Sequence, residues 1–236
     1  MVTPTRTRDA HVAESVARGA HIADPAPLGL AAFALTTFFL SFVNAGLVPA
    51  TVEPVVFGLA LAYGGGAQLL AGMWEFTKGN TFGATAFSSY GAFWLSFWWL
   101  TAHLAEYKIP AADVGKGVGL YLIAWGIFTA YMTVAASRVS AAVLAVFVLL
   151  TATFLVLAWG EFAGSDGIQQ LGGYLGILTA VPAFYASFAG VTAVHLEAPD
   201  RAGRPAQLAR RRRPARTGGP PGGPSPPTDI GATIRS

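Results

Sequence analysis

The stretch AAVLAVFVLLTATFLVLAW, residues 141–159, carries no charged side chain from end to end. A helix rises about 1.5 Å per residue, so about 20 apolar residues cross the hydrocarbon core of a bilayer, which is about 30 Å thick. The stretch therefore predicts a transmembrane helix over Ala141–Trp159. The whole chain has a matching composition, because 11% of its residues are charged, compared with roughly 25% in a soluble globular domain.

Five other apolar stretches of similar length occur in the chain, and short gaps with charged residues, glycine or proline separate them. We therefore predict an all-α integral membrane protein with six transmembrane helices in each protomer. The predicted spans are Leu28–Val48, Pro54–Trp74, Thr81–His103, Val114–Ala136, Ala141–Trp159 and Ile168–Val194. They form one transmembrane domain, residues 24–196, between an N-terminal tail, residues 1–23, and a C-terminal tail, residues 197–236. The C-terminal tail is rich in Arg, Pro and Gly, so we expect it to be disordered.

The positive charges predict the orientation of the helices. An even number of spans places both tails on the same side of the membrane. Without the arginines of the C-terminal tail, five Lys and Arg residues lie on the side of the tails, and only Lys108 and Lys116 lie on the other side. Cytoplasmic loops carry the excess of positive charge. We therefore expect a multi-pass protein of the cell membrane, inner or plasma, with cytoplasmic N- and C-termini.

Residue types that carry catalysis or bind metals are not grouped in this sequence. The four histidines lie in different regions, none has a carboxylate or a second histidine at a ligand spacing on one helix face, and the chain has no cysteine. Hydrolytic and metal sites need such groups close together. We therefore predict no catalytic residue, no metal, no cofactor and no enzyme activity. The positive charge is concentrated in the C-terminal tail rather than on a folded face, so we also predict no nucleic-acid partner.

The predicted spans contain neutral hydrogen-bonding side chains instead of charges. Examples are Thr36, Asn44, Gln68, Ser88 and Ser89. A small polar solute or monoanion that crosses a membrane loses water and must regain hydrogen bonds from such groups, while bulky apolar side chains can gate the path by dewetting. Any single aromatic residue can instead face lipid or pack between helices. The glycine run at residues 64–66 favours close packing of helix backbones over a pore-lining role.

Several motifs appear in a recognisable order. Residues 24–30 are Asp24, Pro25, Ala26, Pro27, Leu28, Gly29 and Leu30, residues 63–65 read Tyr-Gly-Gly, residues 78–83 read Lys-Gly-Asn-Thr-Phe-Gly, and residues 85–94 read Thr-Ala-Phe-Ser-Ser-Tyr-Gly-Ala-Phe-Trp. Together they resemble the signatures of the acetate uptake transporter family, which includes the succinate–acetate permeases. The resemblance extends from about Asp24 to Val194.

The resemblance implies a six-helix protomer, a homo-hexameric ring and a solute path through each protomer. Members of the family take up acetate, and some take up succinate, with proton coupling and channel-like behaviour both described. In the family the narrowest point is formed by a Phe, a Tyr and a Leu. The matching positions are Phe33, Tyr90 and, by gap-free extension through the fourth and fifth spans, Leu150.

One signature position departs from the family, because Asp24 replaces an Asn. An ionised carboxylate would repel an incoming acetate where an amide could donate hydrogen bonds. Asp24 can instead cap the first helix, since Asp and Asn are about equally good at N-caps.

We therefore expect transport of acetate and related small carboxylates across the lipid bilayer, as a proton-coupled symporter or an anion channel. Phe33, Tyr90 and Leu150 are the expected gate, and the neutral polar residues named above are the expected hydrogen-bonding groups of the path. The alternative is a membrane sensor or structural protein that keeps the transporter fold and signals through its basic tail. Deletion of residues 197–236 separates the two, because a transporter keeps its flux and a sensor loses its output.

Overall fold

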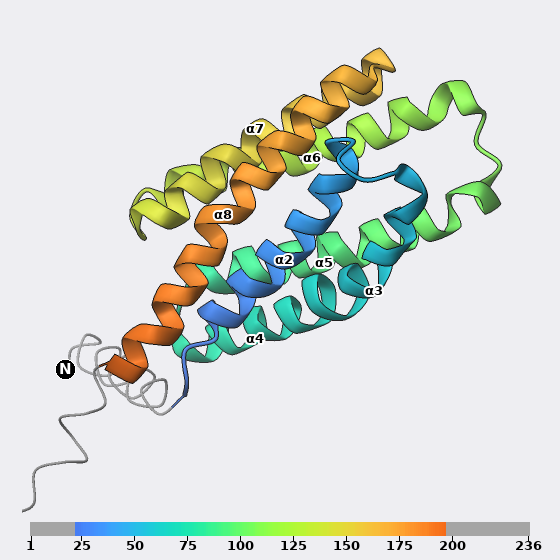
Figure 1. Ribbon diagram of the computed structural model, residues 1–236. Helices are drawn as coiled ribbons and strands as arrows, with labels where there is room; N and C mark the ends of the chain where they lie inside the picture. Colours follow the sequence, from blue (N-terminus) through green and yellow to red (C-terminus); the bar gives the residue numbers. More distant parts are fainter. Residues whose placement is uncertain (1–21, 197–236) are drawn as a thin grey trace, which may run out of the picture. The chain divides into compact units, whose positions relative to one another are not determined.

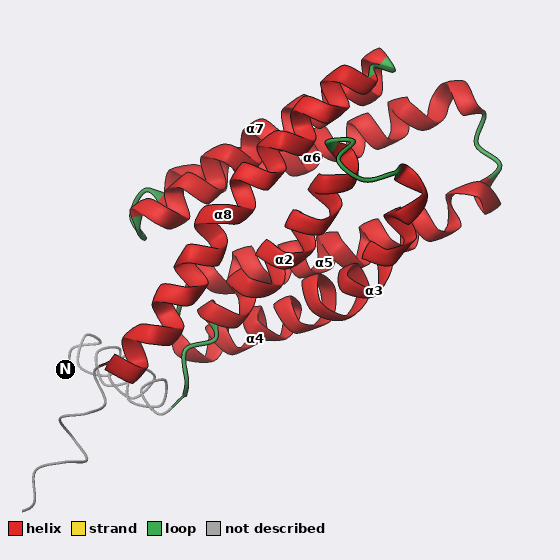
Figure 2. Ribbon diagram, viewed as in Figure 1, coloured by secondary structure: helices red, strands yellow, loops and turns green. Residues whose placement is uncertain are grey.

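The structure is a computed structural model that describes residues 22–196, and every regular element within them is a helix (Figures 1 and 2). The elements are α2 (Ala26–Asn44), η1 (Ala50–Val55), α3 (Val56–Leu61), η2 (Ala62–Ala67), α4 (Gln68–Lys78), α5 (Thr81–His103), η3 (Leu104–Tyr107), α6 (Ala111–Ala136), α7 (Ala141–Ala163) and α8 (Asp166–Leu196). Elements η1 to α4 follow one another directly, so they form one long segment. The expectations for the two tails fall on residues 1–21 and 197–236, outside the described residues.

Five helical segments within residues 22–196 are long and apolar enough to cross a membrane. They are Ala26–Asn44, Ala50–Lys78, Ala111–Ala136, Ala141–Ala163 and Asp166–Ala193, and each overlaps a predicted span. The remaining predicted span is α5, which begins and ends as expected and has 23 residues. Its Ser, Tyr and Trp side chains make it less apolar than the other five. The prediction of an all-α membrane protein is thus confirmed, and five of the six predicted spans are supported.

Local sequence explains where several helices begin and end. The side chain of Asn80 caps α5 by accepting a hydrogen bond from the Gly83 N–H at 3.1 Å. Ser140 caps α7 in the same way, accepting from the Val143 N–H at 3.2 Å. Gly79 ends α4 with a φ of 74°, a left-handed conformation that a residue without Cβ adopts at no steric cost.

The helices alternate in direction along the bundle. Helices α2, α5 and α7 run one way, and the η1–α4 segment, α6 and α8 run the other way (Figure 1). The described chain begins and ends at one end of the bundle, here called the terminal end, which also holds the α4–α5 and α6–α7 turns. The opposite loop end holds the α2–η1 connection, η3 and the α7–α8 turn. Helix α8 packs against α2 and α7, α7 packs against α6, and α4 packs against α5.

The glycine run at residues 64–66 lies in η2, a single π-helical turn. A Cβ added to Gly64 would lie 2.6 Å from Oγ1 of Thr36 on α2, and one added to Gly65 would lie 2.6 Å from Cδ2 of Leu95 on α5. The missing side chains therefore let this turn approach the helices on both sides of it. The tight packing predicted for the glycine run is confirmed for these two residues, which lie against side chains of α2 and α5.

Candidate functional site

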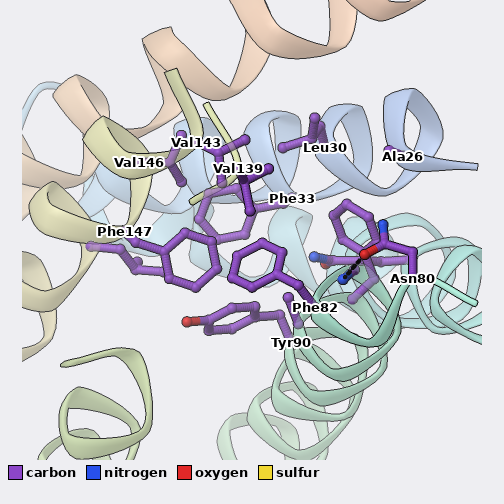
Figure 3. A pocket seen from close by; sticks show the side chains of 15 residues that line it. Ala26, Leu30, Phe33, Asn80, Phe82, Tyr90, Val139, Val143, Val146 and Phe147 are labelled. Atoms are coloured by element: carbon purple, nitrogen blue, oxygen red, sulfur yellow. Dashed lines mark hydrogen bonds between the residues drawn. The ribbon is translucent and has the colours of Figure 1, made fainter. Parts of the chain in front are cut away.

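The described residues enclose a small and a large cavity in the helix bundle, one toward each end. The small cavity, about 80 Å³, lies toward the terminal end and is lined by α2, α4, α5, α7 and the turns near them. The rings of Phe33, Phe82, Tyr90 and Phe147 gather around it (Figure 3). The large cavity, about 360 Å³, lies toward the loop end and is lined mainly by α2, α5, α6 and α7.

Three side chains separate the two cavities. Phe33, Tyr90 and Leu150 line both of them, and among the described residues no other residue does so. They are 5%, 3% and 4% exposed, respectively, and the ring centroids of Phe33 and Tyr90 lie 5.9 Å apart. We call these three side chains the partition. They are the same three residues that the sequence predicts as the gate.

Tyr90 is fixed in the partition by a hydrogen bond to α6. Its hydroxyl lies 2.9 Å from Oγ1 of Thr129. The Thr129 hydroxyl donates its own hydrogen to the carbonyl oxygen of Trp125 at 2.7 Å, so Tyr90 is the donor in the first bond. The ring also packs edge-on against Phe128 and Phe147, with centroids 5.5 and 5.9 Å away. Tyr90 therefore presents an apolar ring to the two cavities and keeps its polar atom bonded to α6.

The large cavity carries most of the polar side chains along this path. Thr37, Ser41 and Asn44 line it from α2, at spacings of three and four residues that place them on one face of the helix. Glu53 and Glu161 line the same cavity near the loop end, and the side-chain amide of Gln169 donates to Glu161 Oε1 at 2.7 Å. The small cavity is chiefly aromatic and aliphatic, with Gln68 and Asn80 as its amides.

The sequence matches the GPR1/FUN34/yaaH family over residues 10–197. The chain belongs to this family. The match confirms the resemblance to acetate uptake transporters that the motifs indicate.

Two relatives and one solved structure illustrate the GPR1/FUN34/yaaH relationship. The ammonia transport outward protein 2 of Saccharomyces cerevisiae is 44% identical over 175 residues, which are 72% of this chain and 61% of that protein. The succinate-acetate/proton symporter SatP of Escherichia coli strain K12 is 39% identical over 166 residues, which are 70% of this chain and 86% of that protein. The solved structure of the bacterial acetate channel SatP superposes with a TM-score of 0.68 at 35% identity, covering 78% of this chain and 98% of that chain.

The structure places the other predicted pathway residues of this family member in two different settings. Asn44 lines the large cavity and Gln68 lines the small one, but Thr36, Ser88 and Ser89 line neither. Thr36 is fully buried and donates its hydroxyl to the carbonyl oxygen of Ala32 at 2.9 Å. Ser88 lies at the contact between α4 and α5, where it packs against Gly72.

The predicted pathway residues leave out Thr37, Ser41 and Trp94, which all line the large cavity. A signal for them exists in the helix repeat. Thr37 follows Phe33 by four residues on α2, and Trp94 follows Tyr90 by four residues on α5. Residues four apart lie on one helix face, so the two gate positions indicate their neighbours one turn further along.

The signature motif that begins at Asp24 joins helices at the terminal end. The Asp24 carboxylate accepts a hydrogen bond from Lys78 Nζ at 3.0 Å and another from the Ala26 N–H at 3.3 Å. The Pro27 carbonyl accepts from the Ser187 hydroxyl of α8 at 2.7 Å. Asp24 lines neither cavity, and its charge is paired with Lys78, so it ties the start of α2 to the end of α4.

A buried carboxylate adjoins the small cavity. Glu75, near the end of α4, is 0% exposed. Its Oε2 accepts a hydrogen bond from the Asn80 side-chain amide at 2.8 Å, and Asn80 in turn lines the small cavity. The sequence places Glu75 at the end of a span, and the structure adds that the α4–α5 turn folds over it.

Proposed function

We propose that this chain carries acetate and related small carboxylates across a membrane, along a path formed by the small and large cavities. The single observation that supports the proposal most directly is the partition, because Phe33, Tyr90 and Leu150 alone among the described residues line both cavities. The similarity to the symporter and to the acetate channel, both named SatP, supports the same solute class.

The chemistry of the partition suits a gate. Phe33 and Leu150 are apolar, and the only polar atom of the Tyr90 side chain is bonded to Thr129. A charged solute at this point would lose its water without gaining hydrogen bonds, which is costly, so the closed partition excludes ions. Rotation of the Phe33 and Tyr90 rings opens the path, and the width of the opening limits the size of the solute.

Ammonium is a second candidate solute, and one structural feature favours it. Glu53 and Glu161 line the large cavity near the loop end, where carboxylates attract cations and repel anions. The yeast relative is named as an ammonia transport protein. The two solutes are distinguished by direct measurement of the uptake of labelled acetate and of labelled methylammonium.

The deciding experiment measures uptake of labelled acetate near neutral pH into proteoliposomes that contain the purified full chain. We expect saturable uptake that empty liposomes lack. Tyr90→Ala widens the partition, so uptake of butyrate relative to acetate rises by about tenfold or more, the usual effect of one or two methylene groups on pocket discrimination. Tyr185→Ala is the matched control, because Tyr185 is 63% exposed on α8 and lines neither cavity.

Two results would contradict this proposal. Unchanged discrimination between butyrate and acetate in Tyr90→Ala would remove the gate assignment. Saturable uptake of labelled methylammonium without any uptake of acetate would show that ammonium, and not a carboxylate, is the solute.

We also propose that six protomers form a ring, that α5 crosses the membrane with the other five segments, and that both termini face the cytoplasm. Large apolar side chains at Leu120, Ile127 and Val134 lie exposed on one face of α6, which suits contact with lipid or a neighbouring protomer. Light scattering of the detergent-solubilised protein gives the number of 24.5 kDa chains. Since the chain has no cysteine, labelling of Arg138→Cys and Lys108→Cys variants reports the two sides directly.

A further inference from the structure

Two buried hydrogen-bond donors beside the large cavity have no hydrogen-bond partner within residues 22–196. They are Nε1–H of Trp94 and the Oγ1 hydroxyl of Thr37, and neither atom makes a hydrogen bond within the described residues. The two side chains are 3% and 6% exposed, and both line the large cavity. Nearly all buried donors in native proteins are bonded, so an unpaired pair beside a cavity calls for a ligand.

Both donors lie at the same level of the path. Thr37 is one helical turn beyond Phe33 on α2, and Trp94 is one turn beyond Tyr90 on α5. Since α2 and α5 run in the same direction (Figure 1), both donors lie next to the partition on its large-cavity side.

The neighbouring hydroxyl of the large cavity is already committed. Thr153 lines the cavity three residues after Leu150, but its hydroxyl donates to the carbonyl oxygen of Leu149 at 2.8 Å. Thr179, which lies 3.2 Å from it, donates to the carbonyl oxygen of Leu175 at 2.8 Å. Trp94 and Thr37 are therefore the side chains at this level that have hydrogen atoms to offer.

We propose that Trp94 and Thr37 form a binding site for the carboxylate group of a short-chain monocarboxylate beside the partition. The site rests on the proposed carboxylate transport and specifies where the solute stops. An indole N–H can only donate and a carboxylate can only accept, so one carboxylate oxygen takes the hydrogen of Trp94 and the other takes that of Thr37. The apolar end of the solute then faces the Phe33 and Leu150 side chains of the partition.

The same chemistry distinguishes a carboxylate from an ammonium ion. Ammonium carries only hydrogen-bond donors, so it cannot satisfy the indole N–H of Trp94. Hydrogen bonds to an ionised acceptor are also about twice as strong as those between neutral groups. The site therefore compensates an anion for part of the water that it loses before it reaches the partition.

The test compares uptake kinetics of labelled acetate in proteoliposomes of the full chain. Trp94→Phe keeps an aromatic ring and removes the N–H, and Thr37→Val keeps the shape and removes the hydroxyl. Each is expected to raise KM about tenfold or more, with a smaller change in the maximal rate, because a bond to the bound solute is lost. Thr37→Ser restores a hydroxyl and is expected to keep KM within about threefold of the wild type, a modest change on the scale of one hydrogen bond.

Matched controls are Trp159→Phe and Thr192→Val. Trp159 is 59% exposed, Thr192 donates to the carbonyl oxygen of Phe188 at 2.9 Å, and neither lines a cavity. Both controls are expected to leave KM unchanged. Gel filtration and thermal unfolding in detergent check that every variant folds.

The outcomes separate this site from the proposed function. If wild-type protein takes up acetate saturably but Trp94→Phe and Thr37→Val both keep the wild-type KM, the site is refuted and carboxylate transport stands. If Thr37→Ser raises the KM for acetate as much as Thr37→Val does, loss of the hydroxyl does not explain the higher KM, and the site is also refuted. Absence of saturable acetate uptake in the wild type overturns both proposals.

Discussion

Tyr90 has a ring that lies in the partition and a hydroxyl that fixes the position of the ring. Tyr90→Phe removes only the bond to Thr129, which is 2.9 Å long. We expect it to lower the free energy of unfolding by about 1 kcal/mol, the usual net value of one hydrogen bond. Thermal unfolding followed by gel filtration measures this loss. The butyrate-to-acetate ratio should stay at the wild-type value, and a ratio as high as that of Tyr90→Ala would mean that the hydroxyl itself sets selectivity.

Asp24 differs from the family residue, but it lines neither of the two cavities. Asp24→Asn removes the charge paired with Lys78, whose side chain is 27% exposed beside that of Asp24 at 44%. Pairs this exposed contribute about 0 to 1 kcal/mol, so we expect a small loss of stability. Since Asp24 lines neither cavity, the KM for acetate should not change. A lower KM in Asp24→Asn would show that the carboxylate repels the solute after all.

The π-helical turn η2 requires glycine at Gly64 more strictly than at Gly66. Gly64→Ala places a methyl group 2.6 Å from Oγ1 of Thr36, which it must displace, whereas Gly66→Ala meets only a carbonyl oxygen at 3.5 Å. We expect Gly64→Ala to destabilise the protein by about 1 to 3 kcal/mol, the cost of overpacking, and Gly66→Ala to be tolerated. Equal unfolding temperatures for the two variants would contradict the close contact between η2 and α2.

The sequence predicts the helices well because long apolar runs and charged gaps determine them independently of packing. The α5 boundaries, Thr81–His103, were predicted as the structure has them, since Asn80 and Gly79 mark its start. Rotation of a helix about its axis is harder to predict when residues around it are similarly apolar. Neighbouring residues point about 100° apart, so choosing Thr36 rather than Thr37 selects a residue that faces Gly64 instead of the cavity.

The positions taken from the family resemblance indicate how α2 and α5 are rotated about their axes. Phe33 and Tyr90 both line the cavities, so the faces of α2 and α5 that contain them are the faces toward the path. The burial of Glu75 could not be predicted in the same way. It depends on how the α4–α5 turn places Asn80 over the carboxylate, which is a tertiary contact.

For the whole molecule, the carboxylates near the loop end should control how strongly anions are attracted to the path. Glu161→Gln removes a negative charge from the large cavity, so we expect the KM for acetate to fall by about twofold to tenfold at low salt, the range of one unit charge at several ångströms in a polar medium. The difference should shrink between about 0.01 M and about 1 M salt, because screening shortens the range of the charge. If Glu161→Gln instead weakened the affinity for a cationic solute and left the KM for acetate unchanged, ammonium would be favoured as the solute.

On the proposed path, the partition also determines where a membrane voltage acts. A water molecule occupies about 30 Å³ in the liquid, so the large cavity of about 360 Å³ has room for solvent, and the insulating part of the path shrinks to the apolar layer that begins at Phe33, Tyr90 and Leu150. The electric potential then falls mostly across that one layer, and each charge that passes gains or loses about 2.3 kcal/mol per 100 mV. An acetate ion that crosses without a proton is therefore driven by the voltage. An acetate ion that crosses together with a proton adds no net charge, so the voltage does not affect its movement.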